Sequence, residues 1–91
     1  MEVEDVFCSR ARLKILKVLN QLGELNVSEI TRRLGINYQT ATNHLKLLEV
    51  EKILQHKSFG RIRLYRLNES SPKAKAIEAL LNVWRDEEAK K

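Results

Sequence analysis

The 91-residue chain has one cysteine, one proline and three glycines, and no apolar run in it exceeds three residues. The lone cysteine excludes a disulfide within the chain. A membrane-spanning helix would need about 20 consecutive apolar residues, so no membrane partner is expected. The N-terminal residues MEVEDV are acidic where a signal peptide would be basic. These absences predict a cytoplasmic protein.

Acidic residues are also missing from long stretches of the chain. None occurs from Ile30 to Leu48, and residues 52 to 75 hold seven basic residues against one acidic residue. The net charge of +5 therefore comes from these two stretches. Clustered positive charge favours a polyanionic partner, because each Lys or Arg near a phosphate releases condensed counterions. A solvated basic face without a partner is the alternative interpretation.

The composition is that of one small globular domain over residues 1 to 91. Hydrophobic residues make up 43% of the chain and charged residues 32%, which is typical of a folded protein. A chain of this size buries a modest core, so a partner subunit would add stability. Cys8 is expected to be a buried, reduced thiol, with a disulfide to its twin across a dimer axis as the alternative.

A helix-turn-helix pattern occupies about residues 27 to 50. Its first helix is expected over residues 27 to 34, and Gly35 supplies the positive φ that a tight helix-ending turn requires. Asn37 is a good N-cap for a second helix over about residues 38 to 50. The apolar spacing places three residues on the inner face of this second helix, namely Ala41, Leu45 and Leu48.

The rest of the second helix carries short hydrogen-bonding side chains and few charges, which suits contact with base edges in the DNA major groove. Gln39 and Asn43 could each make a bidentate contact with adenine, and Lys46 suits a phosphate. His44 is expected to be half-buried and hydrogen-bonded rather than to bind a metal. The predicted DNA contacts of this helix are Tyr38, Gln39, Thr40, Thr42, Asn43 and Lys46.

A basic β-hairpin is expected over about residues 53 to 67, with its turn at Gly60 and Arg61. Three cations gather near its tip: Lys57, Arg61 and Arg63. A charged hairpin directly after a helix-turn-helix is the wing of a winged helix, which lies against the phosphate backbone while the second helix enters the major groove. Arg61 is best placed to enter the minor groove.

Helices are also expected on both sides of these motifs. Ser9 can cap a first helix that ends at Gly23, and Ser71 followed by Pro72 begins a last helix over about residues 72 to 88. The last helix carries an apolar stripe of Ile77, Leu80, Leu81 and Trp84. A small winged domain has little core left to receive this stripe, so we expect it to form a homodimer interface. The predicted fold is therefore mainly α with a small β-hairpin (α+β), a winged helix-turn-helix with a C-terminal dimerisation helix.

These residues resemble the ArsR-like winged helix-turn-helix transcriptional regulators of bacteria and archaea. The resemblance covers about residues 7 to 67. It rests on residues 9 to 19 for the opening helix, 27 to 36 and 40 to 48 for the helix-turn-helix, and 60 to 67 for the wing. It implies a homodimer that places two recognition helices in successive major grooves of a palindromic operator and blocks transcription.

Metal sensing is common in that family, but the chain lacks the ligands that the resemblance implies. In the family the ligands are paired cysteines on the first helix of the helix-turn-helix, or Asp and His residues on the terminal helix. Residues 28 to 35 contain no cysteine, and the terminal helix contains no histidine. We therefore expect no metal and no other cofactor.

The leading hypothesis is a sequence-specific regulator that binds double-stranded DNA, acting as a homodimeric repressor. A protein-interaction winged-helix module and a non-specific architectural DNA-binding protein are the alternatives. An enzyme is not expected. The chain has no Gly-rich phosphate loop, no nucleophile in a recognisable motif with histidine, and no carboxylate cluster beyond residues 86 to 88.

Overall fold

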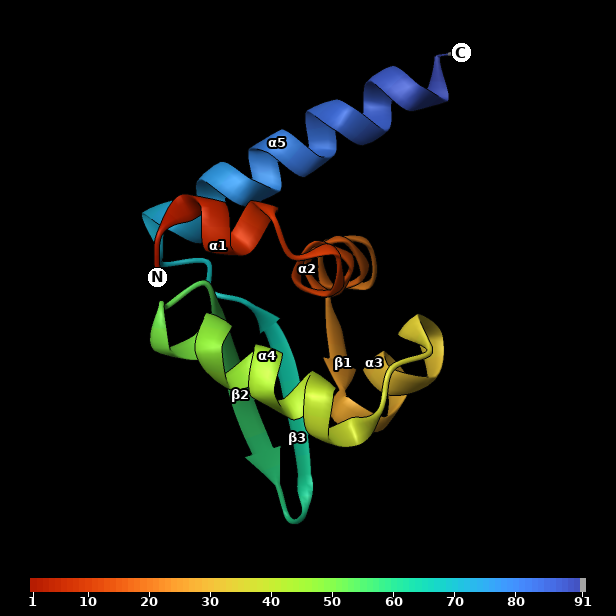
Figure 1. The fold of residues 1–91 in the computed structure, drawn as a ribbon, viewed down its shortest axis with the longest axis vertical. Coiled ribbons are helices and arrows are strands. Elements are labelled where there is room, and N and C mark those ends of the chain that lie inside the picture. Colours follow the sequence, from red (N-terminus) through yellow and green to blue (C-terminus); the bar gives the residue numbers. More distant parts are fainter. Residues whose placement is uncertain (91) are drawn as a thin grey trace.

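The computed structural model describes residues 1 to 90 and confirms the predicted fold class, mainly α with a small antiparallel sheet (Figure 1). In chain order the elements are α1 (Val3–Phe7), α2 (Arg10–Leu22), β1 (Glu24–Asn26), α3 (Val27–Leu34), α4 (Tyr38–Val50), β2 (Leu54–Phe59), β3 (Ile62–Leu67) and α5 (Pro72–Ala89). The strand order is β1-β3-β2, and both pairings are antiparallel. β1 thus adds a third strand to the predicted hairpin.

The helices begin where the sequence places capping side chains. Ser9, Asn37 and Ser71 each accept a hydrogen bond from the backbone amide three residues further along, as N-caps do. α3 ends at Gly35, whose φ of +68° lies in the left-handed region that a helix-ending glycine adopts. Local side-chain chemistry therefore sets the ends of the helix-turn-helix.

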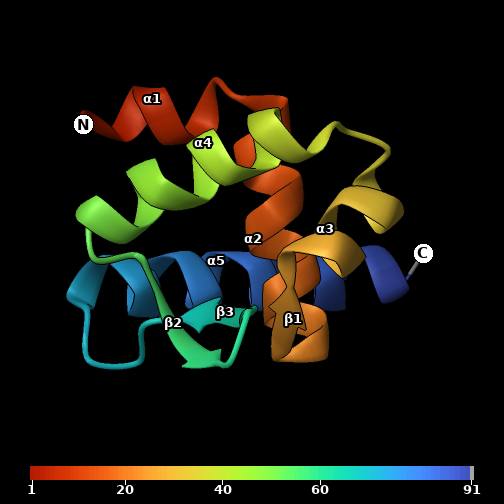
Figure 2. The ribbon, with the colours of Figure 1, turned by 90° about the horizontal axis from the view of Figure 1, so that it is seen from below.

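α2 is the central helix of the domain. It contacts α1, α3, α5 and the strands β1 and β3. Figure 1 shows it nearly end-on below α5, and Figure 2 shows it running between α4 and α5. One apolar cluster surrounds it, and its largest fully buried members are Ile15, Leu16, Leu19, Ile30, Leu45, Leu48, Leu54 and Tyr65. The inner face predicted for α4 lies entirely within this core.

The hairpin of β2 and β3 projects from the end of the molecule that lies farthest from α5 (Figure 1). Its strands pair residue by residue, from Leu54 opposite Leu67 to Phe59 opposite Ile62. The two-residue turn begins with Gly60, whose φ of +61° is what a type II′ turn requires at its first central position.

The apolar stripe of α5 is divided between the core and the surface, which corrects the prediction of a single dimer interface. Ile77 is only 7% exposed and belongs to the core, and Leu81 packs against the core. Leu80 and Trp84 remain 42% and 66% exposed. α5 contacts the central helix α2, so the core extends to this side of α5. Val6 of α1, a helix that the sequence did not predict, belongs to the same core. No helix within residues 1 to 90 is long and apolar enough to cross a membrane.

Candidate nucleic-acid interface

Most of the DNA contacts predicted on α4 face solvent. Tyr38, Gln39, Asn43 and Lys46 are exposed, and Thr40 is half-buried. Nε2 of Gln39 donates a hydrogen bond to Oδ1 of Asn43 at 3.0 Å. This pair, four residues apart, holds the two amides side by side. The Oε1 acceptor of Gln39 and the Nδ2 donors of Asn43 are not used in this bond and remain available to base edges.

Thr42 is not part of this exposed face. Its side chain is only 7% exposed, and its hydroxyl donates to the backbone carbonyl of Tyr38 at 2.8 Å. A helical threonine that bonds back to the carbonyl four residues earlier has used its only donor. The prediction of a DNA contact at Thr42 is therefore wrong, because the buried face of α4 is wider than its apolar residues indicate.

His44 connects α4 to α1 and α2 through hydrogen bonds of Arg12. Nε of Arg12 donates to Nδ1 of His44 at 3.1 Å, and the same guanidinium donates to the backbone carbonyl of Asp5 at 2.7 Å. Burial and the neighbouring Arg12 charge lower the pKa of His44, which keeps the ring neutral and able to accept. The predicted half-buried, hydrogen-bonded role of His44 is confirmed.

A second contact joins the end of α4 to the base of the hairpin. Nδ1 of His56 contacts Oε2 of Glu49, and the His56 ring centroid lies 5.2 Å from that of Tyr65. The sequence does not predict this pair, because it forms only when β2 folds back along the last turn of α4. Among residues 1 to 90, no three His, Cys, Asp or Glu side chains lie close enough together to hold a metal ion.

The three cations predicted at the hairpin tip do not share one face. Lys57 pairs across the strands with Leu64, and Arg63 pairs with Ser58, so alternation directs these two side chains to opposite faces of the sheet. Arg61 lies in the turn between them. Within the described part of the chain, none of the three forms an ion pair with a carboxylate, which leaves their charge available to a polyanion.

The positive charge of α3 is, in contrast, partly neutralised. Glu29 contacts Arg32 at 2.7 Å and Arg33 at 3.3 Å. The hydrogen bond from Arg32 is the main cause that lowers the pKa of Glu29. The two arginines share one carboxylate, so α3 keeps part of its positive charge. Lys46 of α4 and the three hairpin cations form no ion pair within the described part of the chain.

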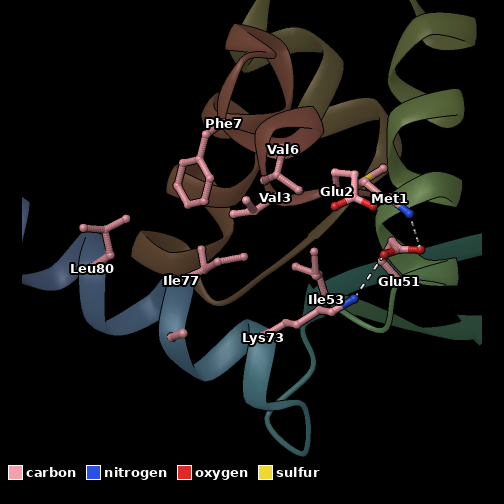
Figure 3. A pocket seen from close by; sticks show the side chains of 11 residues that line it. Met1, Glu2, Val3, Val6, Phe7, Glu51, Ile53, Lys73, Ile77 and Leu80 are labelled. Atoms are coloured by element: carbon pink, nitrogen blue, oxygen red, sulfur yellow. Dashed lines mark hydrogen bonds and ion pairs between the residues drawn. The ribbon is translucent and has the colours of Figure 1, made fainter.

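The opposite end of the molecule carries an apolar groove between α1 and α5 (Figure 3). Its volume is about 320 Å³, and Phe7, Ile77 and Leu80 are among its lining residues. A neighbouring groove of about 480 Å³ continues along α5 past Leu80 to Trp84. Cys8 is exposed just after α1, so the expectation of a buried thiol is wrong.

A salt bridge closes one side of the first groove. Nζ of Lys73 lies 3.1 Å from Oε1 of Glu51, and this hydrogen bond is the main cause that lowers the pKa of Glu51 (Figure 3). The contact ties the start of α5 to the end of α4. Polar residues thus border an apolar surface, as they do around protein interfaces.

Comparison with known proteins agrees with this geometry. A family model described as a helix-turn-helix domain matches residues 8 to 51. No curated protein sequence matches the chain.

Several solved structures share the fold. The AntR antimony-specific transcriptional repressor is 24% identical with a TM-score of 0.76, and the match covers 96% of this chain and 77% of AntR. HlyU from Vibrio cholerae N16961 is 26% identical with a TM-score of 0.75, covering 88% of this chain and 84% of HlyU.

A third solved structure connects the fold to a family. The homodimeric DNA-binding domain of Mb0332 from Mycobacterium bovis, described as a possible ArsR-family transcriptional regulator, is 29% identical with a TM-score of 0.74. The match covers 96% of this chain and 78% of the Mb0332 fragment. The helix-turn-helix match and this neighbour indicate a transcriptional regulator and not an enzyme, in agreement with the expectation. The chain therefore contains a helix-turn-helix domain and is similar over its length to winged helix-turn-helix transcriptional regulators, among them a possible ArsR-family member.

Proposed function

We propose that the chain represses transcription as a homodimer that recognises a specific sequence in double-stranded DNA. The carrying observation is the end of the molecule formed by α4 and the hairpin, which combines the exposed amides of α4 with hairpin cations that no carboxylate pairs. No acidic residue occurs from Ile30 to Leu48 or from Lys52 to Asn68. The absence of carboxylates removes the repulsion that phosphates would otherwise meet.

The residues of this surface divide into two roles. The Gln39 and Asn43 amides contact base edges, and α4 enters the major groove, which at about 12 Å wide admits a helix. Contacts to phosphate and sugar fix the register of the protein on the duplex. We assign these positioning contacts to Tyr38, Thr40, Lys46, Lys57, Arg61 and Arg63.

The homodimer is proposed to form through the apolar end of the molecule. The exposed Leu80 and Trp84 are retained from the predicted interface, and the exposed Phe7 of α1 joins them. Leu81 contributes only its outer part, and Ile77 is excluded because it is buried within one chain. A two-fold axis at this end would place the half-sites about 34 to 36 Å apart on the DNA.

Regulation without a metal is a further part of the proposal. AntR is described as antimony-specific. This chain has no cysteine besides Cys8, and the part that the structure describes brings no metal-ligand cluster together. AntR and BigR from Xylella fastidiosa are both described as repressors, which supports repression here. The protein would act in the cytoplasm, where its DNA lies.

The proposal is tested by selecting bound duplexes from a random pool. The most enriched duplex is then titrated by fluorescence anisotropy at two salt concentrations. We expect an enriched palindrome bound at least about a thousandfold more tightly than random duplex. Affinity for both duplexes should fall as salt rises. Running the selection under reducing and oxidising conditions tests whether Cys8 forms a disulfide across the dimer axis.

The alternatives give different results in the same experiment. An architectural protein would bind random and selected duplexes equally, with the same salt dependence. A protein-interaction module would fail to bind any duplex even at low salt. Either outcome would overturn the proposed function.

A further inference from the structure

The tip of the hairpin carries two large apolar side chains in solvent. Phe59 is 60% exposed and Ile62 is 52% exposed. They face each other across the strands as the last pair before the Gly60 and Arg61 turn. An exposed apolar pair at the end of a hairpin promotes aggregation unless a partner covers it. The cations of the wing do not explain why these two apolar side chains are exposed.

The register of β2 and β3 places this pair on the face of the sheet that does not contribute to the core. Alternation puts Phe59 and Ile62 on the same face as Lys57 and on the opposite face from the buried Tyr65. The core of the domain gains nothing from them, so their apolar character is not needed for folding.

The charge around the pair indicates what covers it. Arg61 lies between the two side chains in the turn, and Lys57 lies two residues before Phe59 on the same face. No acidic residue occurs from Lys52 to Asn68. A second copy of the chain is a poor occupant, because the same cations would face each other. The apolar surface suited to a second copy also lies at the other end of the long axis, on α1 and α5 (Figure 1).

We propose that Phe59 and Ile62 form an apolar tip that enters the DNA minor groove beside the major groove occupied by α4. This inference rests on the proposed function and adds a second kind of contact to it. Proteins that bind the minor groove commonly place Phe or Ile against the sugars and base steps. Arg61 and Lys57 contact the phosphates on either side.

The groove width limits which part of the hairpin can enter. The axes of paired strands lie about 4.8 Å apart, so a hairpin with its side chains is wider than a minor groove of about 6 Å. Only the narrow end of a hairpin can enter such a groove, and a two-residue turn makes that end as narrow as a hairpin allows. The side chains delivered first are those of the turn and of the flanking pair, which here are Arg61, Phe59 and Ile62.

Apolar and cationic side chains differ in how their removal changes the response to salt. Removing a cation from a phosphate lowers the slope of log affinity against log salt by about 0.9. Removing an apolar side chain from the groove weakens binding and leaves the slope unchanged, because that side chain releases no counterion. This difference allows the apolar tip to be tested apart from Arg61.

The test uses the double variant Phe59→Thr/Ile62→Thr on the selected duplex, with threonine chosen because it favours strands. We expect affinity to fall about tenfold with the salt slope unchanged, because the variant no longer places large apolar side chains in the groove. Hydroxyl-radical footprinting, which reports deoxyriboses at the minor groove, should lose its protection beside the α4 site. Dimethyl sulfate protection of guanine N7 in the major groove should remain. Arg61→Ala should instead reduce the salt slope.

Two controls separate apolar contact from hairpin damage. The conservative double variant Phe59→Leu/Ile62→Val should keep both affinity and minor-groove protection. Val50→Thr replaces another exposed apolar residue, at the end of α4, and should leave binding unchanged. Unaltered thermal unfolding of all three variants would exclude misfolding.

The inference and the proposed function can fail separately. Major-groove protection by the unmodified protein without any minor-groove protection would overturn the inference alone. Unchanged affinity and footprint in the Phe59→Thr/Ile62→Thr variant would also overturn it. No protection of any duplex by the unmodified protein would overturn the proposed function and the inference together.

Discussion

The two ends of the domain expose chemically different surfaces. The end formed by α4 and the hairpin carries amides and unpaired cations, whereas the end formed by α1 and α5 carries exposed Leu80 and Trp84 beside apolar grooves. The molecule is 41 Å long, and α5 and the hairpin turn lie at opposite ends of that axis (Figure 1). One copy can therefore engage a partner subunit and a polyanion without competition between the two.

Binding at the two ends also draws on two different contributions to the free energy of association. Apolar burial depends on the area removed from water and responds little to salt, whereas phosphate contacts weaken steeply as salt rises. Substitutions at each end should therefore change different measurements.

The largest effect is expected at the apolar end. The double variant Leu80→Ala/Trp84→Ala should weaken self-association by about 2 to 4 kcal/mol, because large buried side chains dominate interfaces. Sedimentation equilibrium measures the change. Leu22→Ala, which truncates another exposed leucine outside the grooves, is the matched control and should have no effect. Equal dimerisation by the double variant and the control would remove α5 from the proposed interface.

At the polar end, Asn43→Ala should cost about 1 to 3 kcal/mol of discrimination between selected and random duplexes, because it removes a base contact. Competition titrations with both duplexes measure this. Thr42→Val is the control, since the Thr42 hydroxyl is used within α4 and should not affect discrimination. A larger loss of discrimination from Thr42→Val than from Asn43→Ala would show that the assignment of faces is incorrect.

Lys46→Ala should weaken binding to every duplex by a similar factor and reduce the salt slope by about 0.9, the share of one phosphate contact. Anisotropy titrations over a series of salt concentrations give the slope. Lys75→Ala removes the same charge from α5 and should leave the slope unchanged. If both variants change the slope equally, long-range charge and not contact governs binding.

The smallest effect concerns stability near His44. Because its pKa is lowered in the folded protein, stability from this group is complete above about pH 6.5, its unfolded value, and is lost as pH falls toward the folded pKa. Protonation removes the acceptor for Arg12, at a cost of about 1 kcal/mol.

Urea unfolding at neutral and mildly acidic pH measures the His44 effect. His44→Asn, which can still accept from Arg12 but does not titrate, should lose less stability on acidification than the unmodified protein. An identical pH dependence in both proteins would show that His44 does not contribute.

Much of the fold could be predicted because the signals are local. Ser9, Asn37 and Ser71 cap helices through amides three residues away, and Gly35 ends α3 through its own backbone. The inner face of α4 follows from helical spacing. Each of these features depends on residues that are close in the sequence.

The errors arose where distant elements meet. α1 is too short to be stable on its own and depends on packing against α2 and the core, so the capping box at its start does not by itself predict a helix. The burial of Ile77 depends on how α5 packs against α2 and the core, which helical spacing does not reveal. The contact of Glu49 with His56 likewise depends on the path of β2. Exposure of Phe59 and Ile62 required the strand register, which the alternation of the hairpin left open.

The two hydrogen bonds of Arg12 fix the orientation of α4 relative to α1. The planar guanidinium bonds at the same time to the backbone of α1 at Asp5 and to His44 on α4. α4 therefore cannot rotate about its axis relative to α1 without breaking one of these bonds. In a dimer joined through α1 and α5, Arg12 of each copy would therefore link two orientations. One is that of the subunit interface, and the other is the angle at which α4 meets DNA.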